Sequence, residues 1–438
     1  MKSTLFGLDV RMLSLSAVAL VAPLFTVGVL EAQSTTSLSL SDVYGLAAAA
    51  PRVAAASSLA DAARARVTSA KLPPDPEIQL GFMNRELPSL APMDPLGMTQ
   101  IQLMQMLPLG GKLRLSGRIA SNNAEAARAR AADVRWDVRA RAAMQFYDLY
   151  AAESQLNIVR ETKRLVQDIA KVSQVMYSVG DAKQADVLRA QVEVARMTED
   201  ITRMESMRTS MFAKLVATLD LPLTAPPQTT RPPDLPDNLP PLETLASEAE
   251  QRRPMVVAGE KDLAAADAGE RLARKEVWPD LQLGLQYGWR SGEMGTEKMG
   301  SLMIGASVPV YARSRQLRMR DEAAAMRKMS AFDLASMRAE TRGRMAELYA
   351  DFTRARNLRA LYRTTVLPQA EATVTASFAA YRVGDVNLMT LLDNQMTVNR
   401  YRQELITLDA EQGKAIAEME MLLGRELFDP DRITRTGQ

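Results

Sequence analysis

Residues Pro279–Gly284 read Pro-Asp-Leu-Gln-Leu-Gly, and 203 residues earlier Pro76–Gly81 read Pro-Glu-Ile-Gln-Leu-Gly. In both copies apolar and polar residues alternate, as in a β-strand with two different faces. Three more motif pairs recur in the same order at nearly the same separation. They are Ala50-Pro-Arg52 with Arg253-Pro-Met255, Leu107-Pro-Leu109 with Val308-Pro-Val310, and Tyr177-Ser-Val-Gly-Asp181 with Tyr381-Arg-Val-Gly-Asp385. The chain is therefore interpreted as an internal duplication.

The duplication divides the chain into five predicted segments. They are a signal peptide (1–34), a first repeat (35–226), a Pro-rich linker (227–239), a second repeat (240–430) and a C-terminal tail (431–438). The signal peptide is predicted from Lys2, Arg11 and an apolar run that ends at Leu30, with cleavage after Ser34 or after Ala32. A retained membrane anchor is the alternative. No cysteine follows the signal, so we expect no lipid anchor.

Each repeat predicts the same plan: a helix, two strands, and a hairpin of two very long helices. In the first repeat the helix covers Ser41–Lys71 with a break at Pro51, the strands cover Glu77–Glu86 and Met98–Leu107, and the long helices cover Lys112–Met176 and Gln184–Leu219. Apolar residues spaced by threes and fours predict coiled-coil packing within each hairpin. The turns are expected near Gly180 and Gly384, where glycine permits the required backbone.

The second-repeat strands predict a membrane-facing and a water-facing surface. Leu281, Leu283, Leu285, Tyr287 and Trp289 alternate with Gln282, Gly284, Gln286 and Gly288, and Leu302, Ile304, Ala306 and Val308 alternate with Ser301, Met303, Gly305 and Ser307. This alternation over about ten residues is typical of a transmembrane β-strand, with Trp278 and Trp289 at girdle positions. We expect Gln282, Gln286, Ser301 and Ser307 to face a lumen. A half-buried strand in a soluble sandwich is the alternative.

Four strands per chain cannot close a barrel, because open edges in lipid leave backbone groups without hydrogen bonds. The smallest bacterial barrels have about eight strands, so other chains must complete the structure. A dimer with eight strands and a trimer with twelve both satisfy this requirement.

Composition excludes most enzymatic chemistry. The chain has no cysteine and no histidine, which removes thiol nucleophiles, histidine bases and the usual zinc ligands. The net charge of +2 gives no global attraction for nucleic acid. The stretch Leu109-Gly-Gly-Lys112 lacks the spacing of a phosphate-binding loop. We therefore predict neither an enzyme nor a cofactor.

The whole pattern resembles the TolC-type outer membrane factors. The resemblance is carried by the paired strand motifs, by Tyr-x-Val-Gly at each turn, by Leu-x-x-Gln at Leu188–Gln191 and Leu392–Gln395, and by Leu422–Gly424 at the last helix. It implies a mainly α fold with transmembrane β: a homotrimer whose four strands per chain complete a twelve-stranded β-barrel in the outer membrane, and whose hairpins form a periplasmic α-barrel. The implied function is a passive exit duct, supplied by an inner-membrane pump through a periplasmic adaptor.

The resemblance also implies roles for the hairpin turns. Val179, Gly180, Val383 and Gly384 match the positions that contact the adaptor, although the glycines also simply permit the turn. Asp393 and Asp186 are the candidates for a constricting ring of carboxylates. These two aspartates do not align between the repeats, since Asp393 corresponds to Arg189 and Asp186 to Thr390. A solvated helix face is therefore the favoured interpretation of either aspartate alone.

The cargo stays open at this stage. Several of the 26 methionines lie near the strands: Met83, Met98, Met104, Met106, Met299 and Met303. A thioether path for Cu(I) or Ag(I) is one interpretation; the favoured one is that methionine fills helical seams and barrel surfaces. The pattern also resembles members that serve heavy-metal pumps. The alternative to a channel is a periplasmic coiled-coil adaptor or interaction protein without a channel.

Overall fold

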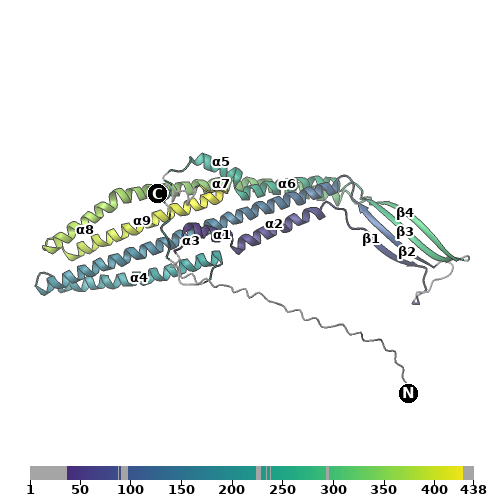
Figure 1. Ribbon diagram of the computed structural model, residues 1–438. Coiled ribbons are helices and arrows are strands. Elements are labelled where there is room, and N and C mark those ends of the chain that lie inside the picture. The colour runs from purple at the N-terminus through teal and green to yellow at the C-terminus, as the bar shows by residue number, and fades with distance from the viewer. Residues whose placement is uncertain are drawn as a thin grey trace, which may run out of the picture. The chain divides into compact units, whose positions relative to one another are not determined.

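The computed structural model describes residues 37–86, 88–89, 97–222, 228–232, 234–236, 238–292 and 295–427. The predicted signal peptide, the C-terminal tail and part of the predicted linker lie outside these ranges. The described chain is mostly helical and carries one small antiparallel sheet (Figure 1).

The first repeat follows the expected order of elements. They are α1 (Leu40–Ala48), α2 (Pro51–Ser69), β1 (Glu77–Met83), β2 (Met98–Leu107), α3 (Lys112–Ser178) and α4 (Gln184–Leu219). Pro51 separates α1 from α2 because a proline is tolerated in the first turn of a helix but not in its interior. β1 is shorter than expected: it ends at Met83 because Asn84 adopts a φ of 50°, outside the extended region.

The second repeat contains α5 (Leu242–Arg252), α6 (Pro254–Lys275), β3 (Leu281–Gly292), β4 (Gly295–Ala306), α7 (Gln316–Leu361), η1 (Tyr362–Val366), α8 (Leu367–Arg382) and α9 (Leu388–Leu423). The sequence predicts one continuous α-helix for the first arm of the hairpin in this repeat. The structure differs, because the arm is interrupted. A π turn, η1, separates α7 from α8, and the Leu367 N–H donates to Tyr362 O. Pro368 explains the interruption, because proline has no N–H and its ring crowds the carbonyl one turn earlier.

The four strands form one sheet in the order β1-β2-β3-β4, with every neighbouring pair antiparallel. β2 pairs with β3, so the sheet joins strands from both repeats. β4 begins at Gly295, earlier than the sequence pattern indicated, because Glu297 and Lys298 pair with Arg290 and Trp289 although they break the apolar alternation. β1 and β4 are the two outer strands of the sheet.

The long helices form two hairpins, and α3 of one hairpin also packs against α9 of the other. We call α3 with α4 the first hairpin, and α7, η1 and α8 with α9 the second hairpin. α3 contacts α2, α4, α6 and α9, so its apolar residues are divided among several partners (Figure 1). α4 carries an apolar stripe at helical spacing whose residues Val187, Ala190, Met197 and Leu215 are buried, as the predicted coiled-coil packing requires.

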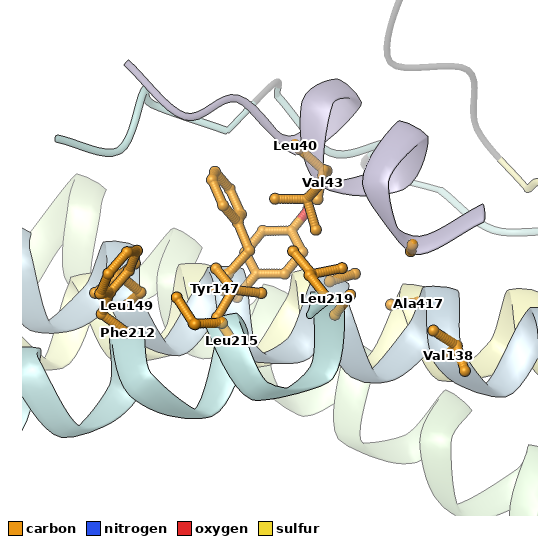
Figure 2. Packing of buried hydrophobic residues seen from close by; sticks show 14 of the residues in the cluster. Leu40, Val43, Val138, Tyr147, Leu149, Phe212, Leu215, Leu219 and Ala417 are labelled. Atoms are coloured by element: carbon orange, nitrogen blue, oxygen red, sulfur yellow. The ribbon is translucent and has the colours of Figure 1, made fainter. Parts of the chain in front are cut away.

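One hydrophobic cluster ties the N-terminal helix to both hairpins. Figure 2 shows Leu40 and Val43 of α1 above Tyr147 of α3, with Leu219 of α4 beside them. Tyr147 is 2% exposed, and its ring lies edge-on to Phe146 at a centroid distance of 6.0 Å. Burial on this scale fixes the position of α3 against α4 and α9.

None of the helices in the described parts of the chain combines the length and the hydropathy that a membrane crossing requires.

Candidate functional site: the sheet faces and the hairpin tips

One face of the sheet is polar and small. Gln282, Gln286 and Ser301, all predicted to face a lumen, lie on it: Gln286 pairs directly with Ser301 across β3 and β4, and Gln282 pairs with Gly305. Gln286 Nε2 donates to Gln100 Oε1 of β2, which extends the polar row across the sheet. Side-chain amides arranged in this way offer both donors and acceptors to water or solute.

Ser307, the fourth predicted position, lies one residue past β4. Its N–H donates to Asp280 O at 3.0 Å, and its hydroxyl accepts from the Asp280 N–H at 3.1 Å. Ser307 therefore closes the ladder between β3 and β4 at the helical end of the sheet.

The opposite face of the sheet is apolar and open to the surroundings of the chain. Its paired rows include Leu281 with Ala306, Leu283 with Ile304 and Leu285 with Leu302. Ile78, Leu302 and Ile304 are at least 70% exposed. Leaving so much apolar area in water is unfavourable at about 25 cal/mol per Å², which indicates that this face meets a nonpolar partner.

A charged cluster joins the sheet to the helices, and the sequence had not predicted it. Lys112, the first residue of α3, is nearly buried, and its Nζ donates to Asp280 Oδ1 at 2.8 Å and to Trp278 O at 3.0 Å. Glu276 lies 3.5 Å from the same Nζ, and the Leu109 N–H donates to Asp280 Oδ1 at 3.3 Å. Since Lys112 and Asp280 come from different repeats, the cluster fixes the base of the sheet to both halves of the chain.

The two hairpin tips have matching backbone geometry. Gly180 and Gly384 have φ values of 93° and 81°, which favour glycine. At the first tip the Gly180 N–H donates to Tyr177 O at 3.1 Å, and at the second tip the Gly384 N–H donates to Tyr381 O at the same distance. These hydrogen bonds satisfy the last carbonyls of α3 and α8.

Each tip presents an apolar side chain to solvent. Val179 is 66% exposed and Val383 is 72% exposed. The tyrosines that precede them differ, since Tyr177 is 43% exposed whereas Tyr381 is 4% exposed. Tyr381 belongs to a buried cluster that joins residues of both hairpins, among them Val166 of α3 and Leu391 of α9. The two tips are therefore alike in backbone and unlike in their packing.

The two predicted gate aspartates occupy different environments. Asp393 is exposed on α9, and within the described residues its carboxylate has no ion pair. Asp186 lies in the first turn of α4, where its carboxylate accepts a hydrogen bond from the Lys183 N–H at 3.4 Å. Asp186 thus has a local role at the start of a helix, whereas Asp393 is available to solvent or to another chain.

The linker docks onto the first hairpin through a carboxylate, Glu153, that no sequence motif indicates. Glu153 of α3 is 8% exposed; its Oε1 accepts from Arg208 Nε of α4, and its Oε2 accepts from the Thr229 N–H, both at 2.8 Å. Arg208 interrupts the apolar stripe of α4, and this interruption was the one signal in the sequence. Gln412 stands at the corresponding position of α9 and is buried.

Two further carboxylates near the linker have shifted pKa values, in opposite directions. Arg425, after α9, makes two hydrogen bonds with Glu248 of α5, at 2.7 and 2.8 Å, and holds the pKa of Glu248 below its ordinary value. Burial raises the pKa of Asp409, although its partner Arg359 opposes the shift.

Comparison with known proteins gives a family match over both repeats. The model of the family described as outer membrane efflux protein matches residues 43–219 and 245–425. One curated relative is the cobalt-zinc-cadmium resistance protein CzcC of Cupriavidus metallidurans. It is 26% identical over 427 residues, which is 93% of this chain and 98% of CzcC.

Solved structures share the fold at low sequence identity. CusC superposes with a TM-score of 0.75 at 17% identity, covering 88% of this chain and 92% of CusC. The outer membrane protein VceC of Vibrio cholerae also gives a TM-score of 0.75, at 14% identity, covering 89% of this chain and 97% of VceC.

Proposed function

Because the chain belongs to the outer membrane efflux protein family, it is an outer-membrane efflux channel with a large periplasmic part, and we propose that three copies form its duct. In this assembly the four strands of each chain complete a twelve-stranded β-barrel, and the six hairpins form a periplasmic α-barrel. The family match does not favour the alternative of a periplasmic adaptor without a channel.

The observation that carries the proposal is the sheet with two opposite faces and two outer strands. Its apolar face suits lipid, and its polar face, with Gln282, Gln286 and Ser301, suits a wet lumen. In the described strands, β1 and β4 each have one edge without a neighbour. Pairing β4 of one copy with β1 of the next satisfies these edges, and closure of the ring leaves none exposed to lipid.

Assembly and conductance test this proposal together. The protein purified in mild detergent is expected to have the mass of three chains by light scattering, and to give stable ionic currents in planar bilayers. A monomer in detergent that gives no current would overturn the proposed duct.

We further propose that the duct is passive and receives its cargo through a periplasmic adaptor at the hairpin tips. Val179 and Val383 support this assignment, since both are exposed beside tight glycine turns and offer apolar contacts to a partner. Energy would be supplied by an inner-membrane pump that the adaptor connects to the duct.

The absence of native cysteine makes the adaptor contact simple to test. Val179→Cys and Val383→Cys are expected to crosslink to a cysteine-scanned adaptor in intact cells. Leu59→Cys is the matched control, because Leu59 is 68% exposed but lies on α2 rather than at a tip. Crosslinking that is equal at Leu59 and at the tips would reject the tip contact.

For the cargo, we propose metal ions. The support is the match to CzcC, a protein named for cobalt, zinc and cadmium resistance, over nearly the whole of both chains. Deletion of the gene is expected to sensitise cells to metal salts more than to dyes or antibiotics. Sensitivity confined to dyes and antibiotics would overturn the proposed cargo and leave the duct intact.

A further inference from the structure

All six methionines of the described strands lie on the polar face of the sheet. They are Met83 in β1, Met98, Met104 and Met106 in β2, and Met299 and Met303 in β4. The register shows the shared face directly: Met106 pairs with Gln282, Met104 and Met303 both pair with Gly284, and Met299 pairs with Gly288. Met83 pairs with Met98.

This placement is not what apolar filling would produce. The other face of the same strands is the apolar one; its large apolar side chains are leucine, isoleucine, phenylalanine, tyrosine and tryptophan, and Gln105 and Lys298 are the large polar ones. If methionine served here only as a hydrophobic residue, it would be found on that face as well. Instead, Met83, Met106, Met299 and Met303 are between 38% and 46% exposed among glutamine, glycine and serine.

Two glycines of β3 each lie between methionines of β2 and β4. A methyl group at Gly288 would lie 3.1 Å from Met98 Sδ, so the Met98 side chain of β2 lies over Gly288, and Gly288 pairs with Met299 of β4. A methyl group at Gly284 would lie 3.1 Å from Met303 Cε, so the Met303 side chain of β4 lies over Gly284, and Gly284 pairs with Met104 of β2. Each glycine therefore leaves a gap that one methionine side chain enters, and a methionine of another strand is paired with the same glycine.

The chemistry of the two gaps selects a class of ligand. Thioether sulfur is a soft ligand that favours Cu(I) and similar ions over hard cations. The described part of the chain gathers no group of three carboxylates that could hold a metal ion, and the sequence has no histidine or cysteine. Zn²⁺ takes imidazole, thiolate and carboxylate ligands. The single carboxylate paired with these methionines is Glu77, opposite Met104, and one carboxylate does not make a zinc site.

We propose that the polar face of the sheet binds soft monovalent cations, Cu(I) and Ag(I), between Met98 and Met299 and between Met104 and Met303. The inference rests on the proposed function, because this face meets the transported solute only if it lines the duct. The two sites lie at Gly284 and Gly288, four residues apart along β3. If both bind weakly, an ion could enter the barrel, pass from one site to the other and leave again.

Silver block of the bilayer current tests the proposal. In nitrate salts, Ag⁺ is expected to reduce the current through the wild-type protein, and Zn²⁺ at the same concentration is not. Replacing all four methionines with leucine, which conserves volume and apolar character, should raise the half-blocking Ag⁺ concentration by about tenfold or more, equivalent to about 1.4 kcal/mol. The control is Met319→Leu with Met326→Leu, two exposed methionines on α7, which should leave the block unchanged.

A second measurement reports on the sites without a current. Peroxide oxidises accessible methionine to the sulfoxide, and peptide mass spectrometry resolves each position. Ag⁺ is expected to protect Met98, Met104, Met299 and Met303 in the detergent-purified protein, and to leave Met319 oxidised as before. Equal protection at Met319, or an unchanged block in the leucine variant, would overturn the sites. The current before silver is added tests the duct itself, so the two failures are distinguishable.

Discussion

The ring of Tyr147 in α3 lies directly against the backbone of Gly413 in α9, and no room remains there for a side chain. The two residues come from different repeats, so this contact packs the first hairpin onto the second. Tyr147 also belongs to the cluster that α1 covers (Figure 2), and its burial raises its pKa above the ordinary tyrosine value.

We predict that Gly413→Ala destabilises the protein by about 1–3 kcal/mol, because the added methyl must displace the Tyr147 ring in a packed interior. The control is Gly343→Ala on α7, where a methyl would meet nothing within 4 Å. That change should be neutral or stabilising by up to about 1 kcal/mol, since alanine is the better helix former. Thermal unfolding of the two variants checks the pair, and equal midpoints would contradict the packing argument.

A second prediction concerns the carboxylate that docks the linker. Glu153→Gln should destabilise the protein by about 3 kcal/mol, because Arg208 loses the charge that compensates its partial burial. The matched control is Glu205→Gln, whose partner Arg160 lies 2.6 Å away in a pair that is about half exposed. Exposed pairs contribute under about 1 kcal/mol, so this control should change little. Limited proteolysis should detect release of the linker in Glu153→Gln alone.

The pair Glu248–Arg425 predicts a dependence on pH. The pKa of Glu248 is lowered in the folded protein, so its stabilisation is fully present above the unfolded value of 4.5 and is lost as the pH falls through the lowered pKa. The wild-type protein should therefore have a higher melting temperature than Glu248→Gln at pH 7. The difference between the two melting temperatures should become smaller only below about pH 4.5. When Arg425→Gln is already present, the effect of Glu248→Gln on the melting temperature should no longer depend on pH in this range. A difference in melting temperature that increases as the pH falls would contradict the lowered pKa of Glu248.

The proposed gate at Asp393 predicts a change in current and no change in assembly. If three exposed Asp393 carboxylates constrict the duct, Asp393→Ala should raise the conductance while the mass in detergent stays the same. Arg400→Ala is a control of charge removal at another exposed position of α9. Unchanged conductance in Asp393→Ala would remove Asp393 from the gate.

The periodicity of apolar residues and the positions of proline and glycine explain why most of the helices and strands could be predicted from the sequence. Proline and glycine fixed the breaks at Pro51, Gly180 and Gly384, and the 3.6-residue and two-residue periods identified helices and strands. The sheet faces also followed from alternation, because a side chain in a strand has only two directions to take. The early part of β4 escaped detection since Glu297 and Lys298 follow the register and not the apolar pattern.

Contacts between distant residues could not be predicted in the same way. Lys112 and Asp280 are 168 residues apart, and nothing in the local sequence of either one indicates a partner. Glu153 gave no signal for the same reason, although Arg208 did, because it interrupts an apolar stripe. The methionines of the strands were visible in the sequence, but their common face depends on the pairing of β2 with β3 across the two repeats.

The π turn η1 has a consequence for symmetry. A π turn holds one residue more than an α turn, so everything after it is rotated by about 100° relative to an uninterrupted helix. Only one of the two hairpins contains such a turn, and the counterparts Tyr177 and Tyr381 end in different surroundings. Six tips in a trimer would therefore form two sets of three. If the proposed trimer forms, a partner titrated onto the ring should bind in two steps of different affinity, because the duplicated chain would present a threefold and not a sixfold docking surface.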